Sequence, residues 1–104
     1  MKKVCVLGFF LGFTFNLELR AQDVNTCMQD LSIFAEYVKV KNYASAVDPW
    51  SKVRENCPDI NVAIYTYGER IIKDKIKNGS PEEIEASKKD LIQLYNEWVQ
   101  YFPK

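Results

Sequence analysis

The chain of 104 residues contains no histidine. Without histidine partners, so few cysteines cannot complete a tetrahedral zinc site. The sequence also lacks a G-x-S-x-G nucleophile motif, a glycine-rich phosphate loop and a cluster of metal-ligand residue types. We therefore expect no catalytic residue, no metal and no cofactor.

An excess of charge of one sign is missing as well. The chain carries 14 basic and 14 acidic residues, with no basic patch or stripe along it. Proteins that bind nucleic acid or anionic membranes need such a patch to neutralise phosphates. The sequence therefore argues against both partner classes and favours a protein or peptide partner.

Long apolar runs are confined to the N-terminus. The first three residues form a short basic start, Val4–Leu17 is almost continuously apolar, and Ala21 offers a small residue for cleavage. This pattern is typical of a secretory signal peptide, and the run is shorter than the about 20 residues that a membrane span needs. We assign residues 1–22 to a signal peptide and residues 23–104 to an exported domain, periplasmic or secreted, without a membrane span.

Cysteine is scarce, and its placement fits export. Cys5 lies in the expected signal peptide, so the mature chain keeps one possible pair, Cys27 and Cys57. In an oxidising compartment, two such cysteines of a small domain are more often bridged than free. We expect a disulfide between them; the alternative is two buried, reduced thiols.

No strand pattern competes with a helical one in the exported domain. Apolar residues recur at helical spacing over about residues 26–41, 43–56 and 60–77, and again from residue 81 to a close at Phe102-Pro103. Four helices of this length joined by short polar turns predict an all-α antiparallel arrangement.

Two prolines bear on the second helix. Pro58 stops it, because proline cannot continue a helix. Pro49 lies inside the apolar pattern and removes a backbone hydrogen bond there. We therefore expect either a bend near residues 45–48 or a helix that restarts at this point.

The boundary between the third and fourth helices has the clearest local signals. Asn78-Gly79 is typical of a left-handed cap after a helix. Ser80 and Glu83 predict a capping box at the start of the next helix, in which Pro81 occupies the first turn.

An internal period of 34 residues relates the first helix to the third. Asp30-x-x-Ile33-Phe34-x-x-Tyr37 is matched by Ile64-x-x-Tyr67-Gly68-x-x-Ile71. This period is the length of a tetratricopeptide repeat.

Over about residues 27–103 the chain resembles the tetratricopeptide repeat family. Tyr67-Gly68 looks like the family's step from a large apolar residue to glycine, Ala46-x-x-x-Trp50 looks like its alanine-to-aromatic step, and Pro58 falls where its closing proline belongs. The repeat framework that the resemblance implies consists of Tyr37, Tyr43, Ala46, Trp50, Val53, Pro58, Tyr67, Gly68, Ile71, Tyr95, Trp98 and Pro103.

The resemblance implies two helical hairpins of an α-solenoid, over about residues 26–58 and 60–103. The first departs from the family at Phe34, which stands in the glycine position, and the second has about eleven extra residues between its matched halves. The signal peptide followed by a cysteine-flanked hairpin also resembles tetratricopeptide-containing exported proteins of Bacteroidetes.

The first hairpin gives the two cysteines a reason to be where they are. Cys27 lies at the start of its first helix and Cys57 at the end of its second, and antiparallel packing brings these ends together. A bridge that closes a loop of about 31 residues stabilises a fold by roughly 3 to 4 kcal/mol in the chain-entropy model.

The function that the resemblance implies is a non-catalytic protein-protein interaction module or scaffold. We expect its partner on the inner face, lined by the first helix of each hairpin. The residues predicted there are Leu31, Ala35, Val38, Lys39, Tyr65, Glu69, Ile72 and Lys73. In the alternative these residues only contact the next helix, and the chain is a small structural helical-bundle subunit of an envelope assembly with no groove-type ligand.

Two repeats are fewer than the three that usually make a stable array. We therefore expect an uncovered apolar side on the fourth helix, involving Tyr95, Val99 and Phe102. Further repeats or a second subunit would cover it.

Overall fold

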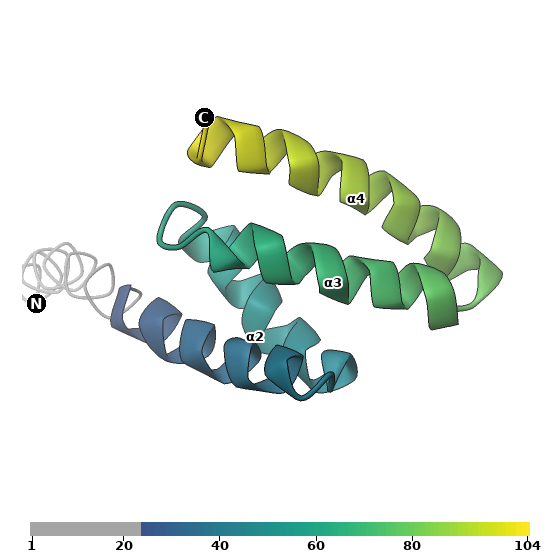
Figure 1. Ribbon diagram of the computed structural model, residues 1–104, viewed down its shortest axis with the longest axis horizontal. Coiled ribbons are helices and arrows are strands. Elements are labelled where there is room, and N and C mark those ends of the chain that lie inside the picture. The colour runs from purple at the N-terminus through teal and green to yellow at the C-terminus, as the bar shows by residue number, and fades with distance from the viewer. Residues whose placement is uncertain (1–23) are drawn as a thin grey trace, which may run out of the picture.

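The computed structural model describes residues 24–104. A helix over residues 24–39, called here the N-terminal helix, is followed by α2 (Tyr43–Asn56), α3 (Ala63–Asn78) and α4 (Pro81–Tyr101), and this part of the chain contains no strand (Figure 1). The expected all-α fold with four helices is confirmed for the described residues. The expected signal peptide, residues 1–22, lies outside them.

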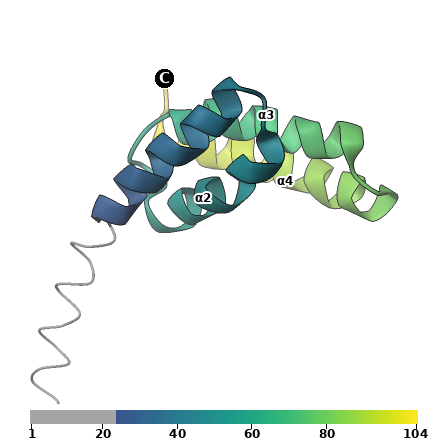
Figure 2. The same ribbon diagram turned by 90° about the horizontal axis from the view of Figure 1, so that it is seen from below.

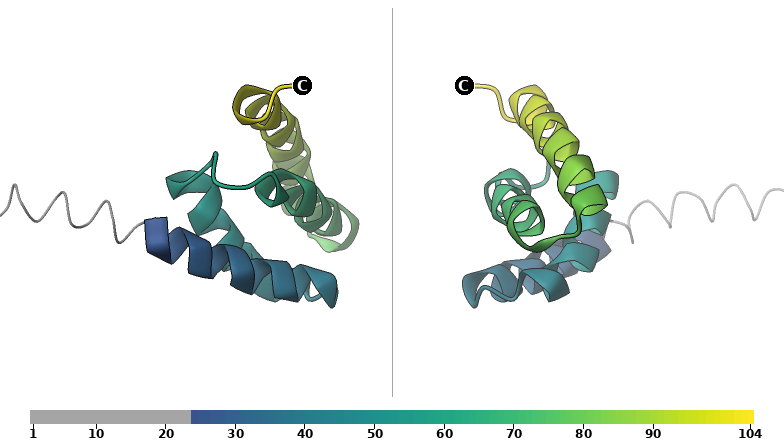
Figure 3. Two further views of the ribbon diagram at one scale, coloured as in Figure 1. Left: turned by 60° about the vertical axis from the view of Figure 1, so that its left-hand side comes forward. Right: turned by 90° about the vertical axis from the view of Figure 1, so that its right-hand side faces the viewer.

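The helix α3 is the centre of the arrangement. Both α2 and α4 pack against it, and α3 and α4 lie side by side after a tight turn (Figure 1). The N-terminal helix lies across α2, on the opposite side of the molecule from α4 (Figures 2 and 3). One face of α4 is therefore covered by α3, while the opposite face is an outer surface of the molecule.

The N-terminal helix ends in a hydrogen-bonded motif that is usually built on glycine. The N–H of Asn42 donates to the carbonyl of Tyr37 (2.8 Å) and the N–H of Lys41 donates to that of Val38 (2.9 Å). This is the Schellman pattern, which places its penultimate residue in the left-handed region. Lys41 takes that position with φ 61°, the only positive φ among the described residues.

At the boundary between α3 and α4 the predicted start of α4 is present, but the predicted end of α3 is not. The capping box is confirmed, with the Ser80 side chain accepting from the N–H of Glu83 and the Glu83 side chain accepting from the N–H of Ser80. The left-handed cap at Asn78-Gly79 is wrong. Gly79 is extended (φ −81°, ψ 174°), because its N–H closes the last turn on the Lys75 carbonyl and the chain then leads directly into the cap of α4.

The helix α2 continues through Pro49 as a single helix, so the expectation of a restart is wrong. Buried side chains on both sides of the proline, Ala46, Trp50 and Val53, hold the two halves against the core. Such packing outweighs a lost backbone bond, because tertiary contacts supply most of the stability of a helix in a protein.

The core lies around α3, which contributes more of it than any other helix. Its fully buried side chains come from all four helices: Phe34, Val38, Ala46, Trp50, Val53, Ile64, Tyr65, Ile71, Ile72 and Leu94. Two adjacent pairs, Ile64-Tyr65 and Ile71-Ile72, are buried on α3, so this helix is covered over more than one face.

Trp50 of α2 approaches α3 closely at Gly68. A Cβ atom at Gly68 would lie 2.7 to 2.9 Å from three atoms of the Trp50 indole ring. The indole N–H donates to the Ile64 carbonyl at 2.8 Å, so the ring contacts α3 with its polar atom satisfied. The glycine is therefore what lets α2 reach α3.

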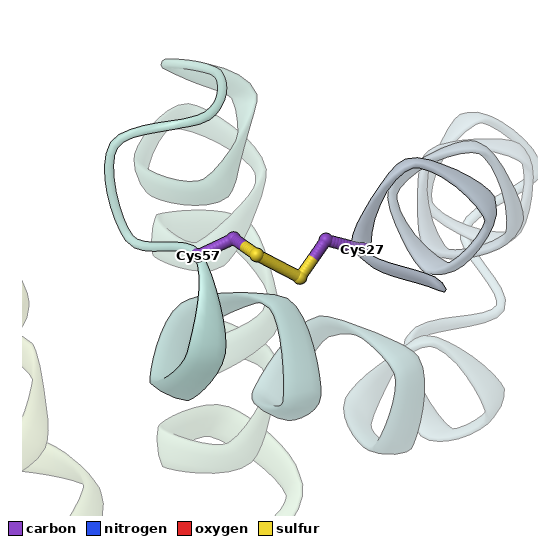
Figure 4. The surroundings of a disulfide bond; sticks show 2 residues. All are labelled: Cys27 and Cys57. Atoms are coloured by element: carbon purple, nitrogen blue, oxygen red, sulfur yellow. A yellow bond between two sulfur atoms is a disulfide. The ribbon is translucent and has the colours of Figure 1, made fainter. Parts of the chain in front are cut away.

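Two contacts fasten the N-terminal helix to the rest of the molecule. A disulfide joins Cys27 to Cys57, whose Cα atoms are 6.4 Å apart (Figure 4), as the sequence predicted. Phe34, which stands where the resemblance expects glycine, is fully buried and meets the Tyr67 ring edge-on with 6.4 Å between centroids. The helix is thus held covalently at one end and by aromatic packing at its middle.

Candidate interaction surface

Three of the eight residues expected on a partner-binding inner face are core residues. Val38, Tyr65 and Ile72 are at most 1 % exposed. They are therefore core residues and not the surface positions expected, because the N-terminal helix at Val38 and α3 at Tyr65 and Ile72 use these positions to pack against their neighbours. The other five are partly buried or exposed at the surface: Leu31, Ala35, Lys39, Glu69 and Lys73.

Tyr65 has a clear structural role at the end of α4. Its hydroxyl donates to the Pro58 carbonyl at 2.7 Å, and its ring contacts those of Trp98, Tyr101 and Phe102 at centroid distances of 6.2, 6.5 and 5.9 Å. Burial, together with the nearby negative charge of Glu97, raises the pKa of Tyr65 to about 12. Tyr65 therefore anchors the aromatic residues at the C-terminal end of α4.

The residues of the expected repeat framework divide by helix. Those in α2 and α3 form the interior, with Ala46, Trp50, Val53, Gly68 and Ile71 buried. Tyr43, Pro58, Tyr67 and Trp98 are partly buried, whereas Tyr37, Tyr95 and Pro103 are exposed. The framework pattern thus predicts packing well in the middle of the chain and less well on the outermost helices.

The helix α4 carries a second apolar stripe beside the one that faces α3. Leu91, Leu94 and Trp98 pack into the core, whereas Ile92, Tyr95 and Val99 are 63 %, 37 % and 67 % exposed. Together with Phe102 at the helix end, the exposed residues form what we call the α4 stripe. Its spacing of three, four and three residues is that of a helix-packing seam. The uncovered apolar side expected on the fourth helix is thereby found at Tyr95 and Val99, whereas Phe102 is partly buried and also packs against the core.

The C-terminal part of the α4 stripe is hollowed into a groove. A cavity of about 440 Å³ is lined by Tyr95, Trp98, Val99, Phe102, Pro103 and Lys104. All of these except Lys104 are apolar or aromatic, and the Tyr95 and Trp98 rings contact each other at 6.5 Å. We call this feature the α4 groove; its chemistry suits an apolar side chain.

The C-terminal half of α4 exposes no charged residue between positions 91 and 103. Between Leu91 and Pro103 the exposed residues are Ile92, Gln93, Tyr95, Asn96, Val99, Gln100 and Pro103. The first half of the same helix exposes the charged residues Glu82, Glu83, Glu85, Lys88 and Lys89. Depletion of charge is a mark of the centre of a protein interface, so the two halves of α4 have different surface character.

Tyr95 is held in place by α3. Its hydroxyl donates to a carboxylate oxygen of Glu69 at 2.5 Å, and Lys73 lies 3.5 Å from the same oxygen. The hydrogen bond from Tyr95 lowers the pKa of Glu69, with the charge of Lys73 adding to the effect, and the same bond raises the pKa of Tyr95. The Tyr95 ring is thus fixed along one edge of the α4 groove before any partner arrives.

An ion cluster that the sequence did not reveal connects α2 to α4. Arg54 donates two hydrogen bonds to Asp90 (3.0 and 2.9 Å) and two to Glu97 (2.9 and 3.2 Å), and its guanidinium lies 5.2 Å from the centre of the Trp50 ring. Burial alone would lower the pKa of Arg54, but the hydrogen bonds to Glu97 and Asp90 outweigh it and raise that pKa. The arginine therefore stays charged and acts as a brace.

The acidic members of this cluster are engaged by arginine. They line a cavity of about 400 Å³ with residues of α2 and α4. Within residues 24–104 no group of three or more histidine, cysteine, aspartate or glutamate side chains is arranged to hold a metal ion. The sequence separations of 36 and 43 residues between Arg54 and its carboxylates gave no local signal for the pairing.

Comparisons with other proteins give this surface no assignment. No protein-family model matches the chain, and no curated protein or solved structure shows significant similarity to it. Its function is therefore argued from its own residues.

Proposed function

We propose that this protein is an exported, non-catalytic interaction module of tetratricopeptide-like type, and that its binding surface is the α4 stripe with its groove. The observation that carries the proposal is the charge-free exposed half of α4, where Ile92 and Val99 are more than 60 % exposed. An apolar stripe at helical spacing is the means by which one helix docks on another.

The order of the helices supports a repeat arrangement. The N-terminal helix with α2 and α3 with α4 form consecutive hairpins, and the 34-residue period places Phe34 and Gly68 at equivalent positions, both at close helix contacts. In stacked hairpins each unit buries the apolar face of its neighbour. In such a stack each hairpin offers one apolar face to the next unit, and α4 has an exposed apolar face of this kind.

Two observations are compatible with export. The Cys27–Cys57 bridge is of the kind that persists in oxidising compartments. No helix within residues 24–104 is long and apolar enough to cross a membrane. A surface that binds protein in the cell envelope needs no basic patch, unlike one that binds nucleic acid. The balanced charge of the chain is compatible with such a surface.

Site-specific photo-crosslinking in living cells tests the proposal. A benzophenone amino acid replaces Val99 in one variant and Lys88 in a second; both side chains are exposed on α4, but Lys88 lies in its charged half. We expect covalent protein adducts from position 99 and few from position 88.

The mass of an adduct reports the partner, and the comparison of positions reports the surface. Absence of adducts at position 99, or equal yields at both positions, would contradict the assignment of the surface to the α4 stripe. Folding of both variants is checked by circular dichroism before the comparison.

A further inference from the structure

The sizes of the side chains in the α4 stripe have a two-fold pattern. When two copies of α4 are laid antiparallel with residue 97 of each at the centre, Ile92 meets Phe102 of the second copy and Tyr95 meets Val99. Each aromatic residue then faces an aliphatic one. Antiparallel helix pairs form such layers, in which a large side chain on one helix fills the space above a smaller one on the other.

The distribution of charge has the same centre. The exposed surface without charge runs from Leu91 to Pro103, whose midpoint is also residue 97. Overlap of this segment with itself therefore leaves the charged residues 82–89 outside the contact. Glu97, at the midpoint, is turned away from the stripe to Arg54, with its side chain 21 % exposed.

From these two coincident centres we infer that the α4 stripe binds a second copy of this chain, as an antiparallel two-fold pair of α4 helices. The inference rests on the proposed function and names the partner of its surface. In the pair, Ile92 of each copy enters the α4 groove of the other, so that two equivalent contacts lie about 15 Å apart along the helix. The contact is closed and self-complementary.

The other exposed apolar stripe lacks this symmetry. Ile33 and Tyr37 on the N-terminal helix and Val40 just after it are exposed, but the ion pair of Glu36 and Lys39 lies among them. A contact of this stripe with α4 of another copy would be head to tail and would propagate into open chains. The pair of α4 helices gives a closed dimer, whereas the head-to-tail contact gives a series of oligomers of increasing size.

The size of the contact sets the concentration range in which the dimer forms. Only a part of one helix from each copy takes part, which is less than the about 800 Å² per partner of a standard interface. We therefore expect a dissociation constant on the order of micromolar or weaker. Among residues 24–104, the exposed charges that flank the charge-free segment are Lys89 and Lys104, so added salt should strengthen the pair by screening their repulsion.

Sedimentation equilibrium measures the association directly. The chain of residues 1–104 is expressed in an exporting bacterial host, and the recovered species is identified by intact mass. We expect a monomer–dimer equilibrium that Val99→Asp weakens at least tenfold. Val40→Asp changes a similarly exposed aliphatic residue just after the N-terminal helix; it is the matched control and should change the dissociation constant less than twofold.

A monomer at every concentration up to about a millimolar would overturn the pairing, as would equal weakening by the two substitutions or a series of species beyond the dimer. Melting curves of both variants show whether either has lost its fold. Since Val40 and Val99 are both exposed, we expect their melting temperatures to remain close to that of the parent.

Lysine cross-linking tests the direction of the helices. In the antiparallel pair Lys89 of one copy lies near Lys104 of the other, whereas within one copy the two are roughly 20 Å apart along the helix. A short amine cross-linker applied to mixed ¹⁴N and ¹⁵N protein should give Lys89–Lys104 links between copies. Links from Lys89 to Lys89 or from Lys104 to Lys104 would indicate parallel helices and overturn the inference.

This experiment can fail separately from the proposed function. A purified protein that stays monomeric, together with adducts at position 99 to a different protein in cells, would reject self-pairing and keep the interaction surface. Absence of any adduct at position 99 would reject both.

Discussion

At the scale of single residues, the contact of Trp50 with Gly68 shows how one side chain and one missing side chain fix the distance between helices. The indole ring occupies the space that a Cβ atom on α3 would need, and its N–H is bound to the Ile64 carbonyl. Close packing of this kind leaves no room for an added methyl group.

Replacement of Gly68 by alanine is therefore expected to destabilise the protein, although alanine is the better helix former. The new methyl group would lie less than 3 Å from the indole ring, and overpacking of a core costs about 1 to 3 kcal/mol. Urea unfolding monitored by tryptophan fluorescence measures the difference.

A second substitution shows whether the ring is the cause. In the Trp50→Phe background the smaller ring leaves space, so Gly68→Ala should then cost less than in the parent. An equal cost in both backgrounds would mean that the ring does not limit the approach of the helices.

Tyr65 gives the fold a defined sensitivity to alkaline pH. Its pKa rises from the ordinary value of 10.0 to about 12 in the folded protein. The protonated form is thus favoured by folding, so this contribution is complete below pH 10 and is lost as pH rises from about 10 to 12. Tyr65→Phe should lower stability by about 1 kcal/mol at neutral pH, through loss of the bond to Pro58.

The same variant should lose less stability between pH 10 and pH 12 than the parent does. The two proteins differ only at this hydroxyl, so ionisation of lysines affects both equally. Thermal unfolding across the pH series tests this; parallel curves would show that Tyr65 ionises in the folded protein as readily as in the unfolded one.

At the scale of helices, local signals predicted what depends on near neighbours. Ser80, Pro81 and Glu83 specify the start of α4 within one turn, and the structure has that cap. The end of the N-terminal helix depends on Lys41 adopting a conformation that lysine seldom takes, so it carried no glycine signal. Pro49 predicted a bend or a restart of the helix, and α2 runs through it without a restart because buried side chains on both sides hold it against the core.

The Arg54 brace belongs to this scale because it joins two helices that both lie against α3. One guanidinium satisfies both Asp90 and Glu97, and its side chain is only 12 % exposed. Lysine cannot reproduce four hydrogen bonds in a fixed plane. The brace therefore sets how α4 lies on α3, and with it the direction in which the α4 stripe faces.

Arg54→Lys should lower the free energy of unfolding by about 1 to 3 kcal/mol, since partly buried carboxylates lose hydrogen bonds. Lys52→Ala is the matched control on the same helix, because it removes an exposed ion pair with Asp48 and should cost at most about 0.5 kcal/mol. Equal effects of the two substitutions would show that the brace adds nothing beyond surface charge.

At the scale of the whole molecule, the sequence specified the helices and the disulfide more fully than the surface. Helical periodicity and the cysteine pair depend on spacing along the chain, which is readable directly. Val38, Tyr65 and Ile72 were expected on the inner face but lie in the core, because periodicity does not tell which way a helix is rotated when several of its faces are apolar. Arg54 and its carboxylates could be paired only once α2 and α4 were placed.

The disulfide is expected to hold the N-terminal helix in the fold. Replacement of Cys27 and Cys57 together by serine should lower the free energy of unfolding by about 3 to 4 kcal/mol, because the open chain gains entropy when unfolded. Hydrogen exchange in residues 24–39 should accelerate more than in α3. An unchanged stability in the double variant would refute the role of the bridge.

The proposed function depends on whether the α4 stripe becomes covered. Methyl NMR with a soluble paramagnetic agent measures this, because the agent attenuates signals of exposed methyl groups. Ile92 and Val99 are compared with Val40, which is 72 % exposed. We predict that Ile92 and Val99 become protected as protein concentration rises or when envelope extract is added, while Val40 stays attenuated. If Ile92 and Val99 remain as accessible as Val40 under every condition, the α4 stripe is not an interaction surface.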